Sequence, residues 1–243
     1  EARGYVVFLR GLPIGREDIT VRTGQGETSI SGTGRLSPPL DLVTRRTVVR
    51  YGPDWTPLSF EFEGSVRLRE ETIKIAFEGE EAKVEATVGG KPISKIDKVS
   101  RQTLVLPNGF FGLYEALAQR LVTTTPPTDL PAYIAPQVEI PVKVSSGVNE
   151  RVQTGTRTFD VRRYELAFAN PGGDLGFQLT ADALGRLIRI TIPAQNLDVV
   201  REDVAAAPSP MQTYANPGDE SVTVPGSGFN MAGTLTKPKI AAT

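Results

Sequence analysis

The sequence predicts a mainly β protein: a curved antiparallel sheet or open half barrel, with one main α-helix on its concave face. Three observations support this prediction. Apolar and polar residues alternate with a period of two over most of residues 5–201, which is typical of half-buried strands. The 24 glycines and 19 prolines separate these runs at short intervals. A single stretch, residues 108–121, has helical spacing instead.

The first 98 residues are typical of an up-and-down meander with short turns. Leu58, Phe60 and Phe62 alternate with charged or polar residues and would share the buried face of one strand. Gly24-Gln25-Gly26 indicates a hairpin turn. The expected strands cover residues 5–9, 18–23, 28–35, 47–51, 58–63, 73–77, 84–88 and 93–96.

The helical stretch carries one apolar stripe with spacing i, i+3, i+4, i+7 and i+11. It comprises Phe110, Leu113, Tyr114, Leu117 and Leu121. Asn108 is the expected N-cap residue, and residues 123–127 end the helix. Two interpretations of the stripe stay open. It fills the concave side of the sheet as core, or it lines a cavity for an apolar ligand together with Trp55.

Strands are expected to resume after the helix, and the character of the chain changes near residue 205. The later strands cover residues 132–135, 138–144, 157–169, 176–180, 186–192 and 197–201. We therefore expect a β domain over 1–204, a linker over 205–220 and a hairpin over 221–243. A lone hairpin is marginally stable in water, so residues 221–238 are expected to find a partner, with a homodimer as one solution.

Composition limits the chemistry. The chain has no His and no Cys, which excludes Ser-His-Asp and Cys-His catalysis and nearly every ordinary zinc site. The balance of 27 basic against 28 acidic residues gives no electrostatic signal for nucleic acid. No apolar run is long enough to span a membrane. The chain starts at Glu1 without Met, so we expect a removed signal peptide and an exported protein, periplasmic or secreted.

The remaining polar clusters are interpreted as solvent-facing strand surfaces and turns. Glu61 and Glu63 share the face opposite Phe60, and Asp174 and Asp182 flank a glycine-rich hairpin. The arginines are also expected to face solvent: Arg45, Arg46, Arg50, Arg157, Arg162 and Arg163. We therefore expect no catalytic residue, no metal and no cofactor in this chain.

The tail resembles the opening hairpin of bacterial α/β-hydrolases. Residues 219–225 (DESVTVP) and 228–238 (GFNMAGTLTKP) match the family pattern V-x-[FI]-P … G-x-x-L-x-G-T-L-x-x-P, with Met231 where Leu is usual. In that family the Gly-x-Ser-x-Gly nucleophile, the acid and the His follow well downstream. The resemblance implies a hydrolase domain as partner and assigns no catalytic residue to this chain.

Residues 1–204 resemble the β-rich exported domains of the DUF3108 type and the LolA-like lipoprotein-carrier fold. The resemblance rests on residues 51–58 (YGPDWTPL), 106–111 (LPNGFF) and 182–187 (DALGRL). It implies an open or half barrel wrapped around helical elements, although this chain has one helix where LolA has more.

Three functions follow from these observations. The first is a non-catalytic accessory domain of an exported α/β-hydrolase, which binds a hydrophobic ligand or covers or assembles the hydrolase domain. The second is a stand-alone periplasmic carrier of lipid or another hydrophobic molecule. The third is a small carboxylate-based enzyme, which the absence of His disfavours.

Overall fold

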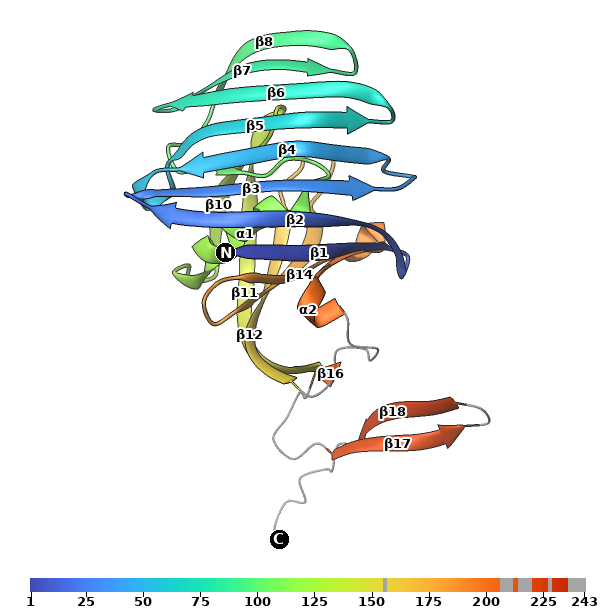
Figure 1. Ribbon diagram of the computed structural model, residues 1–243. Coiled ribbons are helices and arrows are strands. Elements are labelled where there is room, and N and C mark those ends of the chain that lie inside the picture. Colours follow the sequence, from blue (N-terminus) through green and yellow to red (C-terminus); the bar gives the residue numbers. More distant parts are fainter. Residues whose placement is uncertain (155–156, 206–211, 214–219, 227–228, 236–243) are drawn as a thin grey trace.

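The structure is a computed structural model and describes residues 1–154, 157–205, 212–213, 220–226 and 229–235 (Figure 1). It is mainly β, with one large, curved and unclosed sheet and a single main helix, as the sequence predicts. The first meander comprises β1 (Ala2–Leu9), β2 (Leu12–Gly24), β3 (Glu27–Leu36), β4 (Leu42–Tyr51), β5 (Pro57–Val66), β6 (Arg69–Glu78), β7 (Glu81–Val88) and β8 (Lys91–Lys98).

The second half contains the helix and the remaining strands. Its strands are β9 (Leu104–Val105), β10 (Thr128–Ile134), β11 (Val138–Thr154), β12 (Arg157–Phe168), β13 (Leu175–Asp182), β14 (Leu187–Ile192), β15 (Leu197–Arg201) and β16 (Gln212–Thr213). The helical segments are η1 (Pro53–Trp55), η2 (Phe111–Tyr114), α1 (Glu115–Val122), η3 (Pro193–Gln195) and α2 (Glu202–Ala205).

The two meanders join through the first strand of one and the last strand of the other. β1 pairs with β2 on one side and with β15 on the other, with Tyr5 opposite Arg201 and Leu9 opposite Leu197. The strand order is β8-β7-β6-β5-β4-β3-β2-β1-β15-β14-β13-β12-β11-β10-β9, so β8 and β9 are the edges of the sheet.

The sheet curls far enough for side chains to connect its two edge regions, which we call the seam. Tyr133 in β10 donates a hydrogen bond of 2.5 Å to Asp97 in β8. Lys95 in β8 donates one of 3.0 Å to the backbone carbonyl of Gln137. Ser100 donates from its N–H and its hydroxyl to Glu139. No backbone ladder between β8 and β10 is present in the described chain, so the half barrel stays open there.

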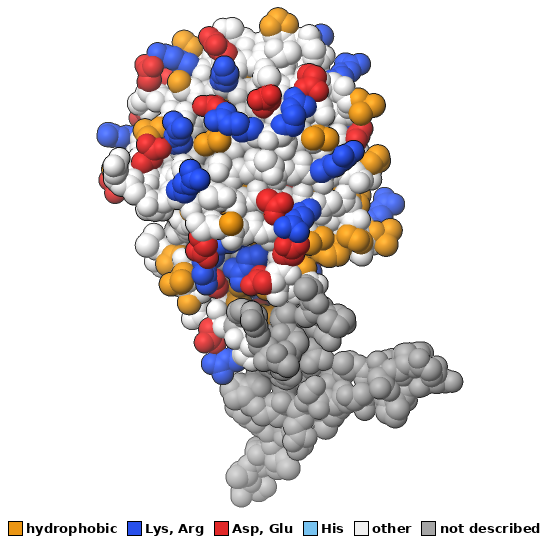
Figure 2. All heavy atoms as spheres, in the orientation of Figure 1, with side chains coloured by type: hydrophobic (Ala, Val, Ile, Leu, Met, Phe, Trp, Pro, Cys, Tyr) orange, Lys and Arg blue, Asp and Glu red, His pale blue; other side chains and the backbone are white. Residues whose placement is uncertain are grey.

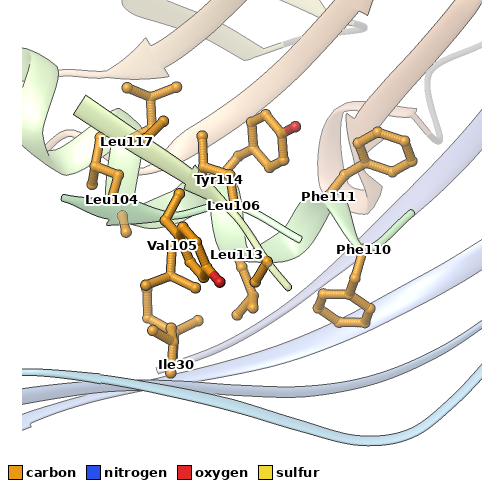
Figure 3. Close-up of a cluster of buried hydrophobic side chains, with 14 of the residues drawn as sticks. Ile30, Leu104, Val105, Leu106, Phe110, Phe111, Leu113, Tyr114 and Leu117 are labelled. Atoms are coloured by element: carbon orange, nitrogen blue, oxygen red, sulfur yellow. The ribbon is translucent and has the colours of Figure 1, made fainter. Parts of the chain in front are cut away.

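The segment from β9 to α1 fills the space between the two halves of the sheet. In Figure 3, Phe110 and Leu113 point toward the first meander, whereas Phe111 and Tyr114 point the opposite way. The Tyr114 ring meets Phe168 and Phe177 edge to face at 6.4 Å. The Phe110 ring lies so close to β3 that a Cβ at Gly32 would be 2.6 Å from it, so glycine is required there. The helix is therefore part of the core of both halves.

The start of the helix corrects one prediction. Asn108 is not its N-cap: the 3-10 turn η2 begins after Phe110, and no side chain at that position caps it. The buried carboxylate of Glu17 in β2 accepts the backbone N–H of Phe111 at 3.1 Å and of Gly112 at 2.7 Å instead. A distant strand thus satisfies the first N–H groups, because this helix end is buried and the sheet lies beside it.

The predicted tail hairpin forms a two-stranded antiparallel sheet of its own, β17 (Glu220–Gly226) and β18 (Phe229–Leu235), with Val222 opposite Gly233. The predicted linker over 205–220 and the end of the chain fall largely outside the described residues, so the domain division stays a prediction.

Candidate ligand-binding site

The half barrel has two ends that differ in chemistry, and the strand register defines them. At one end Leu42 of β4 lies opposite Leu36 and Val66; at the other Tyr51 lies opposite Thr28 and Pro57. We call the first the apolar end; it carries the loops over 37–41, 135–137, 169–174 and 193–196. We call the second the charged end; it carries the turn over 52–56, the first residues of β1 and the turn over 183–186.

The first cavity lies at the apolar end, beneath β4 to β7, and has a volume of about 320 Å³. Its walls are alternate inward-facing side chains of four neighbouring strands and the loop after β10. The apolar side chains are Leu40, Leu42, Phe62, Val66, Ile73, Val88, Pro107, Ala135 and Pro136. Glu71 is its charged lining residue, and its carboxylate accepts the Gly89 N–H at 3.1 Å. The cavity is therefore apolar apart from one carboxylate that already has a partner.

The second cavity lies at the same end, beneath the other half of the sheet, and has a volume of about 280 Å³. Aromatic and aliphatic side chains from η2, β11, β12, β14 and β15 line it: Phe111, Tyr114, Val138, Ile140, Phe168, Ile192 and Leu197. No Lys, Arg, Asp or Glu is among its lining residues in the described chain.

The two cavities share a wall, formed by Leu40, Asn108, Gly109 and Gln137. Gly109 is essential to its shape. Its φ is +84°, a conformation that costs a residue with a Cβ, and a Cβ there would lie 2.9 Å from Leu42 Cδ2. The loop can therefore enter the mouth of the half barrel and divide it in two.

Glu17 anchors this wall from inside the core. Its carboxyl group accepts the N–H groups of Phe111 and Gly112, which lie just beyond the loop over residues 107–109. Burial raises the pKa of Glu17 to about 8, against the opposing effect of the two N–H donors. The site thus depends on a titratable group that contacts neither cavity.

The charged end is closed by ion pairs and hydrogen bonds rather than by apolar packing. Glu115 in α1 is fully buried and accepts from Arg3 at 2.5 Å, from the Leu187 N–H at 2.9 Å and from Tyr5 at 3.3 Å. Asp182 pairs with Arg186 at 2.6 Å and Arg201 at 3.5 Å. These contacts tie the start of β1 to the helix and the second meander.

The structure places the six predicted lining residues in different settings. Phe110, Leu113, Leu117 and Leu121 are almost fully buried and belong to the core. Tyr114 is 6% exposed and lines the second cavity. Trp55 lies at the charged end, where its ring packs against Tyr51 at 5.5 Å. Tyr114 is thus the predicted residue that the structure brings to the candidate site.

The outer face of the first meander carries interspersed positive and negative side chains (Figure 2). A shallow hollow of about 610 Å³ crosses β1 to β4 there. Its four arginines are already paired: Arg3 with Glu1 and Glu115, Arg16 with Asp18 and Glu202, Arg45 with Glu70, and Arg46 with Glu61. This hollow therefore offers a ligand few free groups, and the apolar end is the better candidate.

The other polar clusters mostly agree with the solvent-facing interpretation, but Asp182 does not: it is buried and pairs with Arg186 and Arg201, because the turn after β13 packs against the end of β15. Lys143 pairs with Asp174, and the Asp182 carboxylate accepts N–H groups of its own turn from Leu184 and Arg186. Arg163 pairs with Glu150 at 2.8 Å. The side chain of Arg157 lies outside the described part of the chain. Among the described residues no group of three or more acidic side chains could hold a metal ion.

Sequence reasoning missed Glu17 and the wall residues. Glu17 sits in a strand where polar residues are common, and nothing local distinguishes it from an exposed glutamate. Pro107-Asn108-Gly109 was interpreted as the approach to a helix, and its glycine was the available signal of a tight loop.

Comparison of this chain with family models, with curated proteins and with solved structures found no match. Within the described residues, no helix is both long and apolar enough to cross a membrane.

Proposed function

We propose that the β domain is a non-catalytic module that binds a hydrophobic ligand at its apolar end. The observation that carries this proposal is the pair of apolar cavities on either side of the loop over residues 107–109. Together their volumes fall within the range of small-molecule sites, about 300–1,000 Å³, and their lining is mostly aliphatic and aromatic.

The proposal is tested with a neutral hydrophobic dye, Nile red, and a matched pair of variants. Leu40 is half-buried and lines both cavities, so Leu40→Asp places a charge at their shared wall. Leu68 is 88% exposed in the β5–β6 turn at the same end. We expect Leu40→Asp to weaken dye binding by about tenfold or more and Leu68→Asp to leave it nearly unchanged. Equal binding by the two variants, or none by the parent chain, contradicts the proposal.

A second proposal concerns context: this module is the N-terminal accessory domain of an exported α/β-hydrolase. The resemblance of residues 219–238 supports it, as does the pairing of β17 with β18 in a sheet separate from the main one. Its test is the open reading frame beyond Thr243. A downstream Gly-x-Ser-x-Gly and His support it, and a stop codon or an unrelated domain contradicts it.

The hairpin also remains the proposed dimer contact. Within the described residues each of its two strands pairs only with the other, and an outer edge of this kind favours strand addition from another copy. Light scattering of the chain with and without residues 206–243 tests this. A concentration-independent monomer in both cases contradicts a dimer through the hairpin.

A further inference from the structure

The two cavities lie side by side, so one branched ligand can fill both at once. Leu40, Asn108, Gly109 and Gln137 line both of them, so a molecule that enters both must pass the same wall and extend one apolar arm to each side. A ligand with one chain fills one cavity and leaves the other without apolar contact, which forfeits the hydrophobic gain of that side. The geometry therefore favours two chains over one.

Apart from Glu71 in the first cavity, whose carboxylate accepts the Gly89 N–H, the polar side chains that line the site are uncharged. The carboxamides of Asn108, Gln137, Asn170 and Gln195 line the cavities and make no side-chain hydrogen bond within the described chain. Each offers both N–H donors and a carbonyl acceptor. They surround the wall where the head of a branched ligand would lie.

Tyr114 adds a donor deeper in the second cavity. Its side chain is 6% exposed, and its hydroxyl makes no hydrogen bond within the described residues. Burial, and to a smaller extent the charge of Glu17, raises the pKa of Tyr114, so the hydroxyl stays protonated. Because this hydroxyl has no protein partner within the described residues, it can donate a hydrogen bond to a ligand carbonyl or hydroxyl in the second cavity.

Cations are absent from the lining. No Lys or Arg lines either cavity in the part of the chain that the structure describes. Lys95 contacts the wall through the Gln137 carbonyl, but it is held at 2.7 Å by Asp97 in the seam. A carboxylate or phosphate head would lose hydration here without gaining a counter-charge.

We propose that the ligand is a neutral amphiphile with two acyl chains and a head that carries ester and hydroxyl groups, as in a diacylglycerol. This inference rests on the proposed function. The ligand's chains occupy the two cavities, and its head lies against the carboxamides of the shared wall. Tyr114 donates its hydroxyl to an ester carbonyl in the second cavity.

The test compares three short lipids on the full chain by titration calorimetry: 1,2-dioctanoylglycerol, monooctanoylglycerol and dioctanoyl phosphatidic acid. We expect the diacylglycerol to bind about tenfold or more tightly than either of the others. If phosphatidic acid or the monoacyl lipid binds as tightly, the ligand class is wrong while hydrophobic binding stands. If none of the three lipids binds and Nile red also fails to bind, the proposed function itself is contradicted.

Two variants locate the polar contacts. Tyr114→Phe removes one hydroxyl and keeps the ring, so we expect it to weaken diacylglycerol binding about fivefold, whereas Leu68→Asp, which lies outside both cavities, should leave that affinity unchanged. Gln137→Lys adds a cation at the wall and is expected to shift the preference toward phosphatidic acid. Both variants must first be shown to be folded by circular dichroism. If neither then changes the affinity for the diacylglycerol or the order of preference among the three lipids, the assignment of the head group is overturned.

Discussion

The two ends of this half barrel differ in what occupies the space between the helix and the sheet. At the charged end the space between helix and sheet is closed by ion-paired and hydrogen-bonded polar groups, with Glu115 accepting from Arg3, Tyr5 and the Leu187 N–H. At the apolar end it stays open as two cavities with uncharged groups at their shared wall. The difference teaches that polar networks fix the position of the helix at one end, while packing leaves space at the other end, where we propose that the ligand binds.

The largest expected effect is on stability at the charged end. Glu115→Gln leaves Arg3, whose side chain is 7% exposed, without its principal buried counter-charge. We expect a loss of about 3 kcal/mol in the free energy of unfolding, measured by urea denaturation. Ligand affinity at the apolar end should not change. Glu61→Gln, which breaks a surface pair with Arg46, serves as the control and should cost less than about 1 kcal/mol. A loss as small as that control contradicts the assigned role.

The second effect is a pH dependence of stability caused by Glu17, the residue that holds the chain just after the shared wall. Because the pKa of Glu17 is raised to about 8 in the folded state, from 4.5 for the free side chain, the folded chain holds this proton more tightly than the unfolded chain. Its stabilising contribution is full below about pH 4.5 and is lost as pH rises toward about 8.

The free energy of unfolding should therefore fall by about 2 kcal/mol more in the parent chain than in Glu17→Gln between about pH 5 and about pH 7. Urea titrations of both proteins at each pH measure this difference. Parallel pH profiles would show that Glu17 is ionised in the folded state throughout this range.

The third effect concerns the wall itself. Gly109→Ala introduces a Cβ at φ +84° and 2.9 Å from Leu42 Cδ2. We expect a stability loss of about 1 kcal/mol and weaker Nile red binding, because the loop must move into one cavity. Gly79→Ala, in a turn with positive φ and no neighbour within 4 Å, controls for backbone strain alone and should leave dye binding intact. If both variants bind the dye as the parent chain does, the loop over residues 107–109 does not shape the binding site.

The smallest effect is expected at the seam. Tyr133→Phe removes the hydrogen bond to Asp97 that connects β10 to β8. Asp97 keeps Lys95 as a partner, so we expect a loss of about 0.5–1 kcal/mol in thermal or urea unfolding. A loss above about 3 kcal/mol would mean that the seam, and not the β1–β15 ladder, holds the half barrel together.

Much of the fold could be predicted because its signals are local. The alternation of Leu58, Phe60 and Phe62 specifies which face of β5 is buried, apart from Leu58, which is 41% exposed near the strand start. The helical stripe predicted α1 for the same reason. The pairing of β1 with β15 has no local signal, because it joins residues nearly 200 positions apart, such as Tyr5 and Arg201.

The candidate site was harder to predict, since a cavity depends on what packing leaves unfilled. Leu117 and Tyr114 belong to one stripe, yet Leu117 is core and Tyr114 borders open space. Trp55 was predicted to line the cavity together with the stripe, but the strand register places it at the charged end, away from both cavities. The Glu17 cap links residues 94 and 95 positions apart, a distance over which spacing carries no information.

The position of Trp55 allows the most direct test of ligand binding at the apolar end. Lipids with brominated acyl chains quench tryptophan fluorescence only at short range. In the parent chain, Trp55 at the charged end should stay unquenched. In the variant Trp55→Phe/Val138→Trp, the introduced indole replaces a half-exposed lining residue of the second cavity and should be quenched strongly on titration with brominated dioctanoylglycerol. Quenching of Trp55, with the introduced indole unaffected, would place the ligand elsewhere and contradict the account.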